Sequence, residues 1–390
     1  MTLAAVIKRS QTDREAWKYT SLEGLEEVGF KKQQRHSGES RNPSPKHDAR
    51  EPLCLCGGEE MDPRFRGDDA RLESVPRLVF LNGIWQPEAS CLEGLPEGIM
   101  QGDAAAGYEL TLAEQTCLVT LPVELLFINE AGVEPAEINV KLRIVLGASG
   151  RLTLIEKHVT EGTGEAQLAQ VIETEIELGP QAKLVHGKIF SNGNAVAHLA
   201  RTKVRADKGA YYDNFTLLRG GNPARNEIDV TLAGEMAQCR LYGAMLLRGS
   251  EHADTTTCIT HAAPHGTSRQ NYRSVMGDKA RGVFQGKIKV AEGAVKTDGY
   301  QLSRALLLSD QAEMDAKPEL EIYADDVKCS HGSTVGELDE RALFYLRSRG
   351  IGEEEARALL IKAFVGELLD EIQTPALREA VQREVEGWLR

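Results

Sequence analysis

The residues best suited to chemistry lie in a short alternating run in the last third of the chain. Val327, Cys329 and His331 alternate there with Lys328 and Ser330. In an extended strand this period of two places the thiol and the imidazole on one face. A thiolate beside an imidazole suits iron, zinc or a sulfur-transfer step. The plainer interpretation is a structural cysteine with a surface histidine beside it, because free cysteines are often simply buried.

This run lies at the junction between two kinds of sequence pattern. Short alternating runs predict strands over about 146–332, and helical periodicity predicts a helical region over 333–390. Gly332 is expected to let the chain turn, and Ser333 or Thr334 to cap the helix that follows. The sequence therefore predicts a β core of residues 146–332 and a C-terminal helical domain of residues 333–390.

A loose repeat runs through the β region. Glycine-containing turns place alanines at regular intervals, and the steps between them are 28, 27, 43 and 14 residues, close to multiples of 14. Self-similarity at a fixed spacing favours the stacked rungs of a β-solenoid over a sandwich. The alanines are Ala182, Ala210, Ala237, Ala280 and Ala294.

The helical region carries an apolar stripe with two interpretations. The stripe consists of residues at helical spacing, and it either packs on the protein's own core or docks a partner. Three glutamates in the first turn suit the positive end of the helix dipole, and Thr374-Pro375 begins a last helix. The stripe residues are Ala356, Leu359, Leu360, Ala363, Phe364 and Ile372.

Residues 1–145 are predicted to form a mixed helical and β region. Leu3, Val6 and Ile7 form a short helical stripe, and Trp17 and Tyr19 are expected to anchor this segment to the body. Residues 31–71 contain no Val or Ile, four Pro, four Gly and seventeen charged residues. Such a composition cannot offset the entropy of ordering, so this stretch is predicted to be a disordered insertion.

Composition excludes several classes of protein. The chain has 390 residues and a formal net charge of −13, which argues against nucleic-acid binding because that depends on neutralising phosphates. The N-terminus lacks the regions of a signal peptide, and no apolar run is long enough to span a membrane. Seven cysteines without regular spacing do not indicate a disulfide framework. We therefore expect a cytoplasmic protein without membrane or nucleic-acid partners.

Two motif-like stretches fail as sites. Gly282-Val-Phe-Gln-Gly-Lys-Ile288 has one residue too few for a phosphate-binding loop, and isoleucine stands where Ser or Thr must hold magnesium. Cys258 and His261 have the spacing of soft-metal ligands, but Pro264 breaks the helix that would align His261 with His265. A structural turn is the favoured interpretation there.

Several long stretches of the amino-acid sequence resemble a known family. Lys317–Gly332, Leu343–Ile351 and Val283–Ile288 closely resemble the SufD family of the bacterial SUF machine for iron–sulfur cluster assembly. The resemblance is dense from about residue 255 to 370. It implies a parallel β-helix core with helical ends, and a scaffold subunit without catalysis of its own.

The resemblance also implies partners and a site. It implies pairing with a SufB-like paralogue and docking of a SufC-like ABC ATPase on the C-terminal helices, at Leu359, Leu360, Ala363 and Phe364. Cys329 and His331 would lie at the interface of the two β-helix subunits, as ligands of iron or sulfide or as their support. The iron–sulfur cluster would be transient and shared, and ATP would bind only the partner.

Alternatives stay open at this point. Members of the family have been linked to a reduced flavin, but no flavin motif is readable here. The isolated chain could pair with itself. One alternative hypothesis is that the chain is a SufB-like scaffold that carries a cluster alone. Another is that it is a β-helix carbohydrate-active enzyme. Only 5% of residues are aromatic, few for stacking sugars, which argues against the enzyme.

Overall fold

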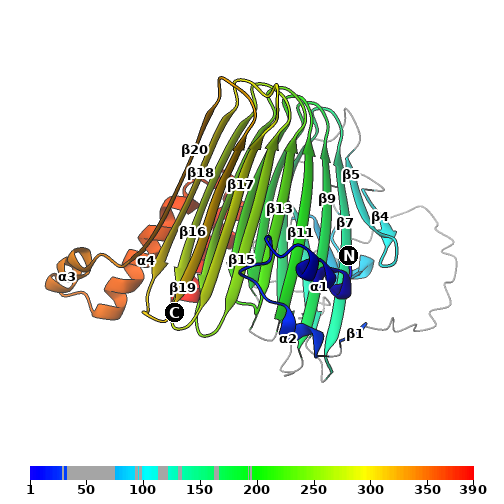
Figure 1. The fold of residues 1–390 in the computed structure, drawn as a ribbon. Coiled ribbons are helices and arrows are strands. Elements are labelled where there is room, and N and C mark those ends of the chain that lie inside the picture. The colour runs from blue at the N-terminus through cyan, green and yellow to red at the C-terminus, as the bar shows by residue number, and fades with distance from the viewer. Residues whose placement is uncertain are drawn as a thin grey trace.

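A computed structural model provides the fold of the chain (Figure 1). It describes residues 1–28, 30–32, 75–92, 95, 99–112, 122–130, 134–161, 167–191, 193 and 196–390. Two ten-stranded sheets face one another and form a parallel β-solenoid of about seven turns. The β-helix fold predicted from the sequence is confirmed.

From β5 onward, successive strands alternate between the two sheets. Sheet A runs in the order β19-β17-β15-β13-β11-β9-β7-β5-β4, and β1 also pairs with β7. Its strands are β1 (Lys31–Lys32), β4 (Met100–Asp103), β5 (Gly107–Leu112), β7 (Ala136–Leu146), β9 (Leu168–Leu178), β11 (Val196–Ala206), β13 (Ala224–Leu232), β15 (His252–His261), β17 (Arg281–Val290) and β19 (Glu313–Ile322).

Sheet B runs in the order β20-β18-β16-β14-β12-β10-β8-β6-β2-β3. Apart from the short β2–β3 pair, its strands pair in parallel. Its strands are β2 (Arg77–Leu81), β3 (Ile84–Trp85), β6 (Val123–Glu130), β8 (Arg151–Glu161), β10 (Lys183–Ser191), β12 (Tyr211–Arg219), β14 (Gln238–Leu247), β16 (Thr267–Met276), β18 (Asp298–Leu307) and β20 (Lys328–Glu337).

Four of the repeat alanines lie at the corner that leads from sheet A to sheet B, and Ala280 lies at the opposite corner, between β16 and β17. The five repeat alanines are completely buried. Gln181, Gly209 and Met236 each precede one of them and adopt left-handed backbone angles. Their N–H groups donate to carbonyl oxygens of the next turn, at 2.8, 2.9 and 3.1 Å respectively. The faint repeat thus marks a hydrogen-bonded ladder of turns, where only a small side chain fits inside.

The β core extends beyond its expected limits at both ends. Strands β6 and β7 precede residue 146 and already belong to the two sheets, and β20 continues to Glu337. The expected turn at Gly332 is wrong, because Gly332 pairs with Leu302 and the ladder with β18 continues past it. The helix cap is Asp339, whose Oδ1 accepts from the N–H groups of Arg341 and Ala342 at 2.8 and 3.3 Å.

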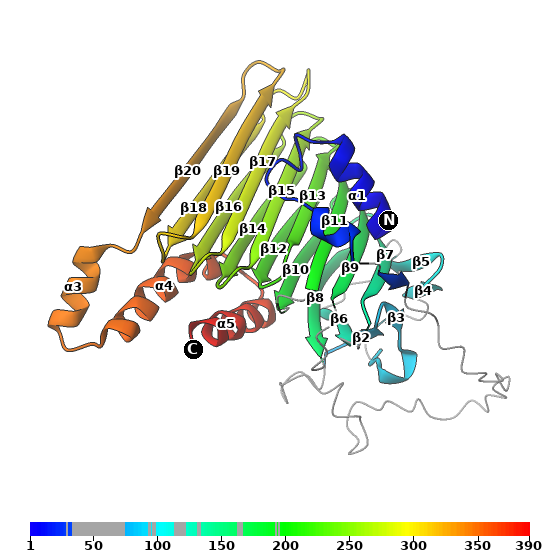
Figure 2. The same cartoon turned by 60° about the horizontal axis from the view of Figure 1, so that its bottom comes forward.

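Of the three C-terminal helices, α4 and α5 cover the outer face of sheet B, and α3 projects beyond it (Figure 2). They are α3 (Glu340–Ser348), α4 (Glu353–Leu369) and α5 (Pro375–Leu389). Ile361, Val365 and Leu368 of α4 pack on outward side chains of the sheet. Helix α5 comes so close to β10 that a Cβ on Gly187 would lie 2.2 Å from Leu377. Most of the apolar surface of α4 and α5 therefore belongs to the protein's own core.

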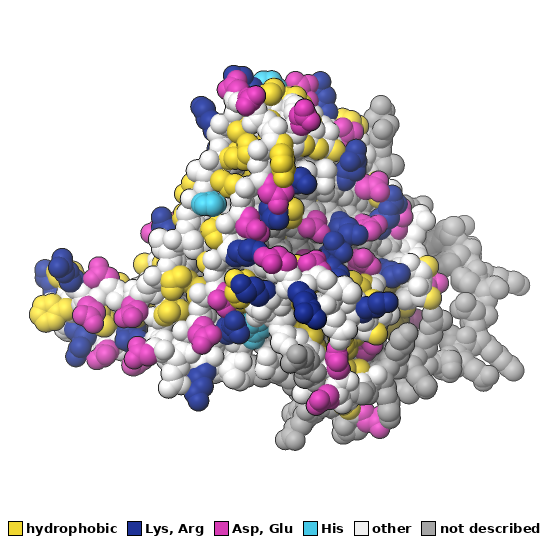
Figure 3. All heavy atoms as spheres, viewed as in Figure 1, with side chains coloured by type: hydrophobic (Ala, Val, Ile, Leu, Met, Phe, Trp, Pro, Cys, Tyr) yellow, Lys and Arg dark blue, Asp and Glu magenta, His cyan; other side chains and the backbone are white. Residues whose placement is uncertain are grey.

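The N-terminal segment crosses the outer face of sheet A. It contains α1 (Leu3–Thr12), a turn and the short α2 (Glu23–Glu26). At one end the Leu3 N–H donates to Glu137 Oε1 of β7 at 2.8 Å. At the other, Glu15 pairs with Lys317 of β19, the last strand of the sheet. The surrounding face mixes acidic and basic side chains (Figure 3). The segment thus bridges sheet A from β7 to its last strand, β19.

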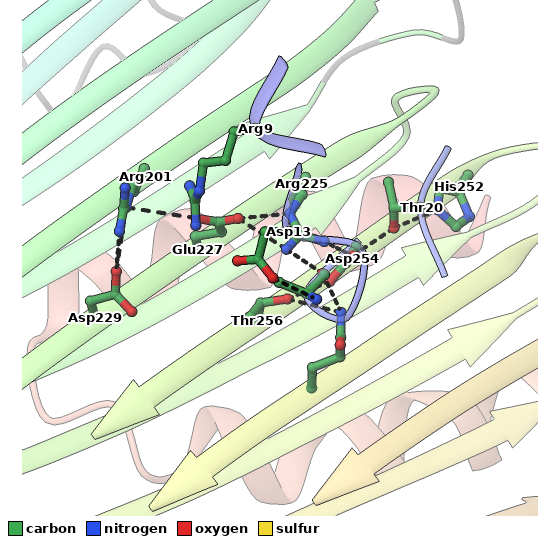
Figure 4. Close-up of polar contacts among 12 residues, drawn as sticks. Arg9, Asp13, Thr20, Arg201, Arg225, Glu227, Asp229, His252, Asp254 and Thr256 are labelled. Atoms are coloured by element: carbon green, nitrogen blue, oxygen red, sulfur yellow. Dashed lines mark hydrogen bonds and ion pairs between the residues drawn. The ribbon is translucent and has the colours of Figure 1, made fainter. Parts of the chain in front are cut away.

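A buried charged cluster holds this segment in place (Figure 4). Arg225 is 2% exposed at its side chain, pairs with Asp254 and Glu227, and lies 3.9 Å from the ring centroid of Trp17. Its Nη2 also donates to the carbonyl of Ala16 at 2.8 Å. The anchor predicted at Trp17 is confirmed, since its side chain is buried. Of the segment 31–71, only Lys31 and Lys32 lie within the described residues.

We expect Arg225→Ala to lower the free energy of unfolding by about 3–5 kcal/mol, because it leaves the carboxylate of Asp254 buried without its partner. Denaturant unfolding measures the loss, and limited proteolysis reports release of residues 1–26. Arg281→Ala is the matched control: its pair with Asp315 on the same sheet is 42% exposed at the arginine, so the loss should stay below about 1 kcal/mol. Equal losses in both variants would contradict the anchoring role of the cluster.

Candidate functional site at the open end of the solenoid

Strand β20 carries both candidate residues and ends its sheet. Cys329 pairs with Gly299 and His331 with Gln301 of β18. Paired residues of parallel strands point to the same side, and Gln301 is buried inside the solenoid. Cys329 and His331 therefore share the inner face of the last turn, about 6.6 Å apart along the strand. The alternation read from the sequence is confirmed for these two residues.

Cys329 lies half-buried at this end of the core. It packs against a small apolar cluster that includes Ile288, Val290 and Leu320. Burial raises the pKa of the Cys329 thiol and the charge of Asp298 adds to this, although a hydrogen bond from the Gly299 backbone opposes it. The side chain is consequently a protonated thiol at neutral pH. It becomes a thiolate ligand only when a metal displaces its proton.

His331 occupies the exposed position of the pair. Its side chain continues the inner stack of the solenoid past the last buried turn. Among the described residues no three His, Cys, Asp or Glu side chains converge in a geometry that would hold a metal ion. Cys329 and His331 are thus two donors of the right chemistry for iron on one face of one strand.

The other soft-ligand pair considered from the sequence does not come together. Cys258 points to the outside of β15, whereas His261 points into the solenoid and is completely buried. The Nε2 of His261 lies 2.9 Å from the Ser268 hydroxyl. Burial lowers the pKa of His261 to about 4, so its ring is neutral. The interpretation of this stretch as structural agrees with these contacts.

The last turn leaves both sheets with a free edge. Among the strands that the structure describes, β19 pairs only with β17 and β20 only with β18. Large apolar side chains are exposed around these edges: Ile322 (43%), Tyr323 (61%) and Val335 (48%). A free strand edge with exposed apolar side chains is a template for pairing with another chain.

Comparisons with known proteins identify the family of this chain. The model of the SUF system FeS cluster assembly, SufBD core domain, matches residues 127–364. The chain belongs to the SufBD family.

Individual relatives of this SufBD protein support the same family assignment. The iron–sulfur cluster assembly protein SufD of Escherichia coli (strain K12) is 32% identical over 392 residues, which cover 94% of this chain and 86% of that protein. An iron–sulfur cluster assembly SufBD family protein of Synechocystis is 31% identical, with coverage of 77% and 75%. A chloroplastic protein of Arabidopsis thaliana is 29% identical, with coverage of 74% and 62%. The resemblance to the SufD family is confirmed.

The four docking residues predicted on the helices of this SufBD protein do not share one environment. Leu359 is 42% exposed and Ala363 is also exposed. Leu360 and Phe364 are half-buried, and the Phe364 ring centroid lies 5.0 Å from the guanidinium of Arg273 on β16. The largest exposed apolar side chains nearby are Phe344 and Tyr345 of α3, at 75% and 56%. None of the described helices is long and apolar enough to cross a membrane.

Sequence reasoning missed the polar residues inside the solenoid of this SufBD protein. Glu156, His158 and His186 are completely buried and bonded to one another, with Glu156 Oε1 2.6 Å from His158 Nε2 and Oε2 2.9 Å from His186 Nε2. Gln270 and Gln301 form a second buried pair directly behind His331. The only signal in the sequence is a polar residue at an inward position of an alternating strand, and register is needed to read it.

The raised pKa of Cys329 predicts slow alkylation. The reactive form is the thiolate, so the iodoacetamide rate of the isolated chain should still be rising above pH 9.0, the ordinary thiol pKa. Mass spectrometry of the peptide that contains Cys329 gives the pH–rate profile, with an unfolded digest as the control. A midpoint below that of the digest would contradict the burial argument.

Proposed function

We propose that this chain is the SufD-like scaffold subunit of an iron–sulfur cluster assembly complex. In this proposal it pairs with a SufB-like subunit through the open end of its solenoid and binds a SufC-like ATPase through its C-terminal helices. The observation that carries the proposal is the position of Cys329 and His331, on the inner face of the strand that ends sheet B. Two donors suited to iron thus stand beside a free strand edge.

The free edges favour a partner that adds strands. Strand addition satisfies the outward N–H and C=O groups of β19 and β20, and it covers the exposed side chains of Ile322 and Val335. A second solenoid of the same family offers matching edges. A SufB-like paralogue is therefore the proposed partner, and a homodimer uses the same edges when this chain is isolated.

The cluster is cargo in this proposal, held between the two subunits. The Cys329 thiolate and a neutral imidazole are competent donors toward iron, and side chains of the partner complete the site. Because the Cys329 thiol has a raised pKa, cluster assembly there releases a proton. The chain acts as a scaffold, and ATP hydrolysis belongs to the SufC-like subunit.

The proposed docking surface for the ATPase is the outer side of α3 and α4. Leu359 and Ala363 are exposed there, and Leu360 and Phe364 support them from the half-buried side. Helix α3 projects away from the sheets (Figure 2) and carries Phe344. An exposed apolar helical surface on a projecting element suits a groove on a partner.

We expect His331→Ala and Cys329→Ser each to reduce cluster build-up roughly tenfold or more, while folding and complex formation persist. The measurement is the iron and sulfide content of the co-expressed complex after anaerobic purification, with circular dichroism to verify folding. Ser330→Ala is the matched control, because Ser330 lies between the two on the opposite face of β20. Full cluster loading in the His331→Ala complex would remove His331 from the mechanism.

The docking surface is tested by Leu359→Asp combined with Ala363→Asp. Two charges on exposed apolar positions should weaken co-purification of the ATPase roughly tenfold, since they interrupt the contact without disturbing the buried face of α4. Gln373→Asp adds a charge at an exposed position between α4 and α5 and serves as the control. Undiminished binding in the folded double variant would place the ATPase on another surface.

A further inference from the structure

Charged side chains form rows on the outer face of sheet A, and the sign of the charge alternates between neighbouring strands. The outward row of β9 is acidic, and the outward row of β11 is basic. Acidic and basic side chains accordingly mix on this face (Figure 3). The two rows consist of Glu173, Glu175 and Glu177 on β9, and of Arg201, Lys203 and Arg205 on β11.

The acidic row of β9 has cations on both sides. The register places Glu173 between Lys141 of β7 and Arg201 of β11. Glu175 lies one step along the row and faces a cation on each neighbouring strand in the same way. Cross-strand pairs of opposite charge stabilise a sheet, whereas like charges directly opposite one another destabilise it. An acidic row inside this sheet is therefore built with a basic row on each side.

Strand β19 repeats the acidic row at the edge of the sheet, where the described residues occupy only one side. Three of its glutamates lie directly opposite cations of β17. The three pairs are Glu313–Arg281, Glu319–Lys287 and Glu321–Lys289. Asp315 is a fourth carboxylate, and its Oδ2 lies 2.8 Å from Nη2 of Arg281. Lys317 is the one cation at an outward position of this strand, and it pairs with Glu15.

The carboxylates of this row are accessible from the open side. The side chains of Asp315, Glu319 and Glu321 are 33, 37 and 34% exposed, and that of Glu313 is 70% exposed. The hydrogen bond from Lys287 lowers the pKa of Glu321, so this carboxylate keeps its charge at neutral pH. Cations of another chain can therefore reach the row where β19 has no neighbour.

The backbone of β19 selects only weakly among incoming strands. Pro318 has no N–H group to give to an added strand, and a proline on an edge strand opposes indiscriminate pairing. The side-chain charges are then the feature of this edge that distinguishes one incoming strand from another.

A second copy of this chain complements the acidic row poorly. If β19 of that copy came alongside, carboxylates would face carboxylates. If β20 came alongside instead, Lys328 would be the one cation among its outward side chains. The outward positions of β20 are Lys328, Ser330, Gly332, Thr334 and Gly336. Self-pairing at this end therefore lacks the basic row that flanks the acidic row of β9.

We propose that β19 pairs with an edge strand that carries Lys or Arg at alternating outward positions, and that this strand belongs to the SufB-like subunit. The inference deepens the proposed function and rests on it. It adds that the acidic row makes the open end prefer that subunit to a second copy, because the same edge attracts one chain and repels the other. The added strand continues the alternation of the sheet, with the acidic row of β19 between the basic row of β17 and that of the partner.

The test reverses two charges of the row in the full chain. Glu319→Lys combined with Glu321→Lys should weaken binding to the purified SufB-like subunit at least about tenfold at low salt, because two attractions become repulsions. Calorimetric titration at about 0.05 M and about 0.5 M salt measures the affinity, since high salt screens exposed charges. Native binding should weaken as salt rises, and binding of the lysine variant should not.

Glu175→Lys combined with Glu177→Lys is the matched control. These two residues have the same spacing and lie on the same face, but β9 has a described strand on each side. Binding of this control should stay within about twofold of native binding, because its charges lie far from the edge. Circular dichroism verifies folding, and if the lysine variant does not fold, Glu319→Gln combined with Glu321→Gln decides by a loss of roughly threefold. Native affinity in the edge variants, or equal losses in edge and control variants, overturns the proposal.

The outcomes for this inference and for the proposed function are distinct. Salt-sensitive binding of the native chain that the edge variants lose supports both. Native binding that the edge variants retain overturns the role of the acidic row and leaves pairing with the SufB-like subunit intact. Absence of binding between the native chain and that subunit overturns the proposed pairing and, with it, this inference.

Self-association of the isolated chain distinguishes a second copy from the SufB-like subunit. Sedimentation velocity should show that it is weaker than binding to that subunit. If the edge variants abolish self-association and leave binding to the subunit unchanged, a second copy is the occupant and the proposal is overturned. Exchange of Lys or Arg for Glu on the edge strand of the SufB-like subunit should restore binding to the lysine variant. Failure to restore it overturns direct pairing of the two rows.

Discussion

In-register parallel pairing is the constraint on which this structure depends. Each inward side chain lies on the one a turn earlier and supports the one a turn later. Apolar residues fill most of the interior in this way, from Leu78 and Phe80 at one end to Phe284 at the other. Because all turns share one register, the position of a side chain at the open end depends on the pairing of residues two or three turns away.

The same in-register pairing brings buried polar side chains together inside the solenoid, where they must satisfy one another. Burial alone would raise the pKa of Glu156, but the charge of Lys188 and hydrogen bonds from His158 and His186 hold it well below its usual range. Such networks fix one arrangement because an unpaired member would be costly. The Gln270–Gln301 pair applies this logic nearer the open end, where the last member of the stack is exposed and accessible to chemistry.

The two outer faces of the solenoid are closed by different means, and the end is left open. Helices α4 and α5 cover sheet B with an apolar layer. The N-terminal segment crosses sheet A and is held by the buried pair of Arg225 and Asp254. Both coverings stiffen the stack of turns and leave the edges of β19 and β20 uncovered by the described residues. The candidate residues lie beside those edges.

The sequence by itself indicated the helical ends and the shared face of Cys329 and His331, because both depend on local period. Its faint repeat only favoured a solenoid, and the resemblance to a known family implied the parallel β-helix. The sequence also placed the chain in its family through long stretches such as Lys317–Gly332. Only the tertiary structure decided where β20 ends, since pairing with β18 overrides the turn signal at Gly332. The tertiary structure also showed that Leu359 is exposed whereas Phe364 is half-buried. It showed as well that Gln301 is the buried neighbour of His331 in the preceding turn. Those relations depend on register and on packing between distant segments, which no local pattern records.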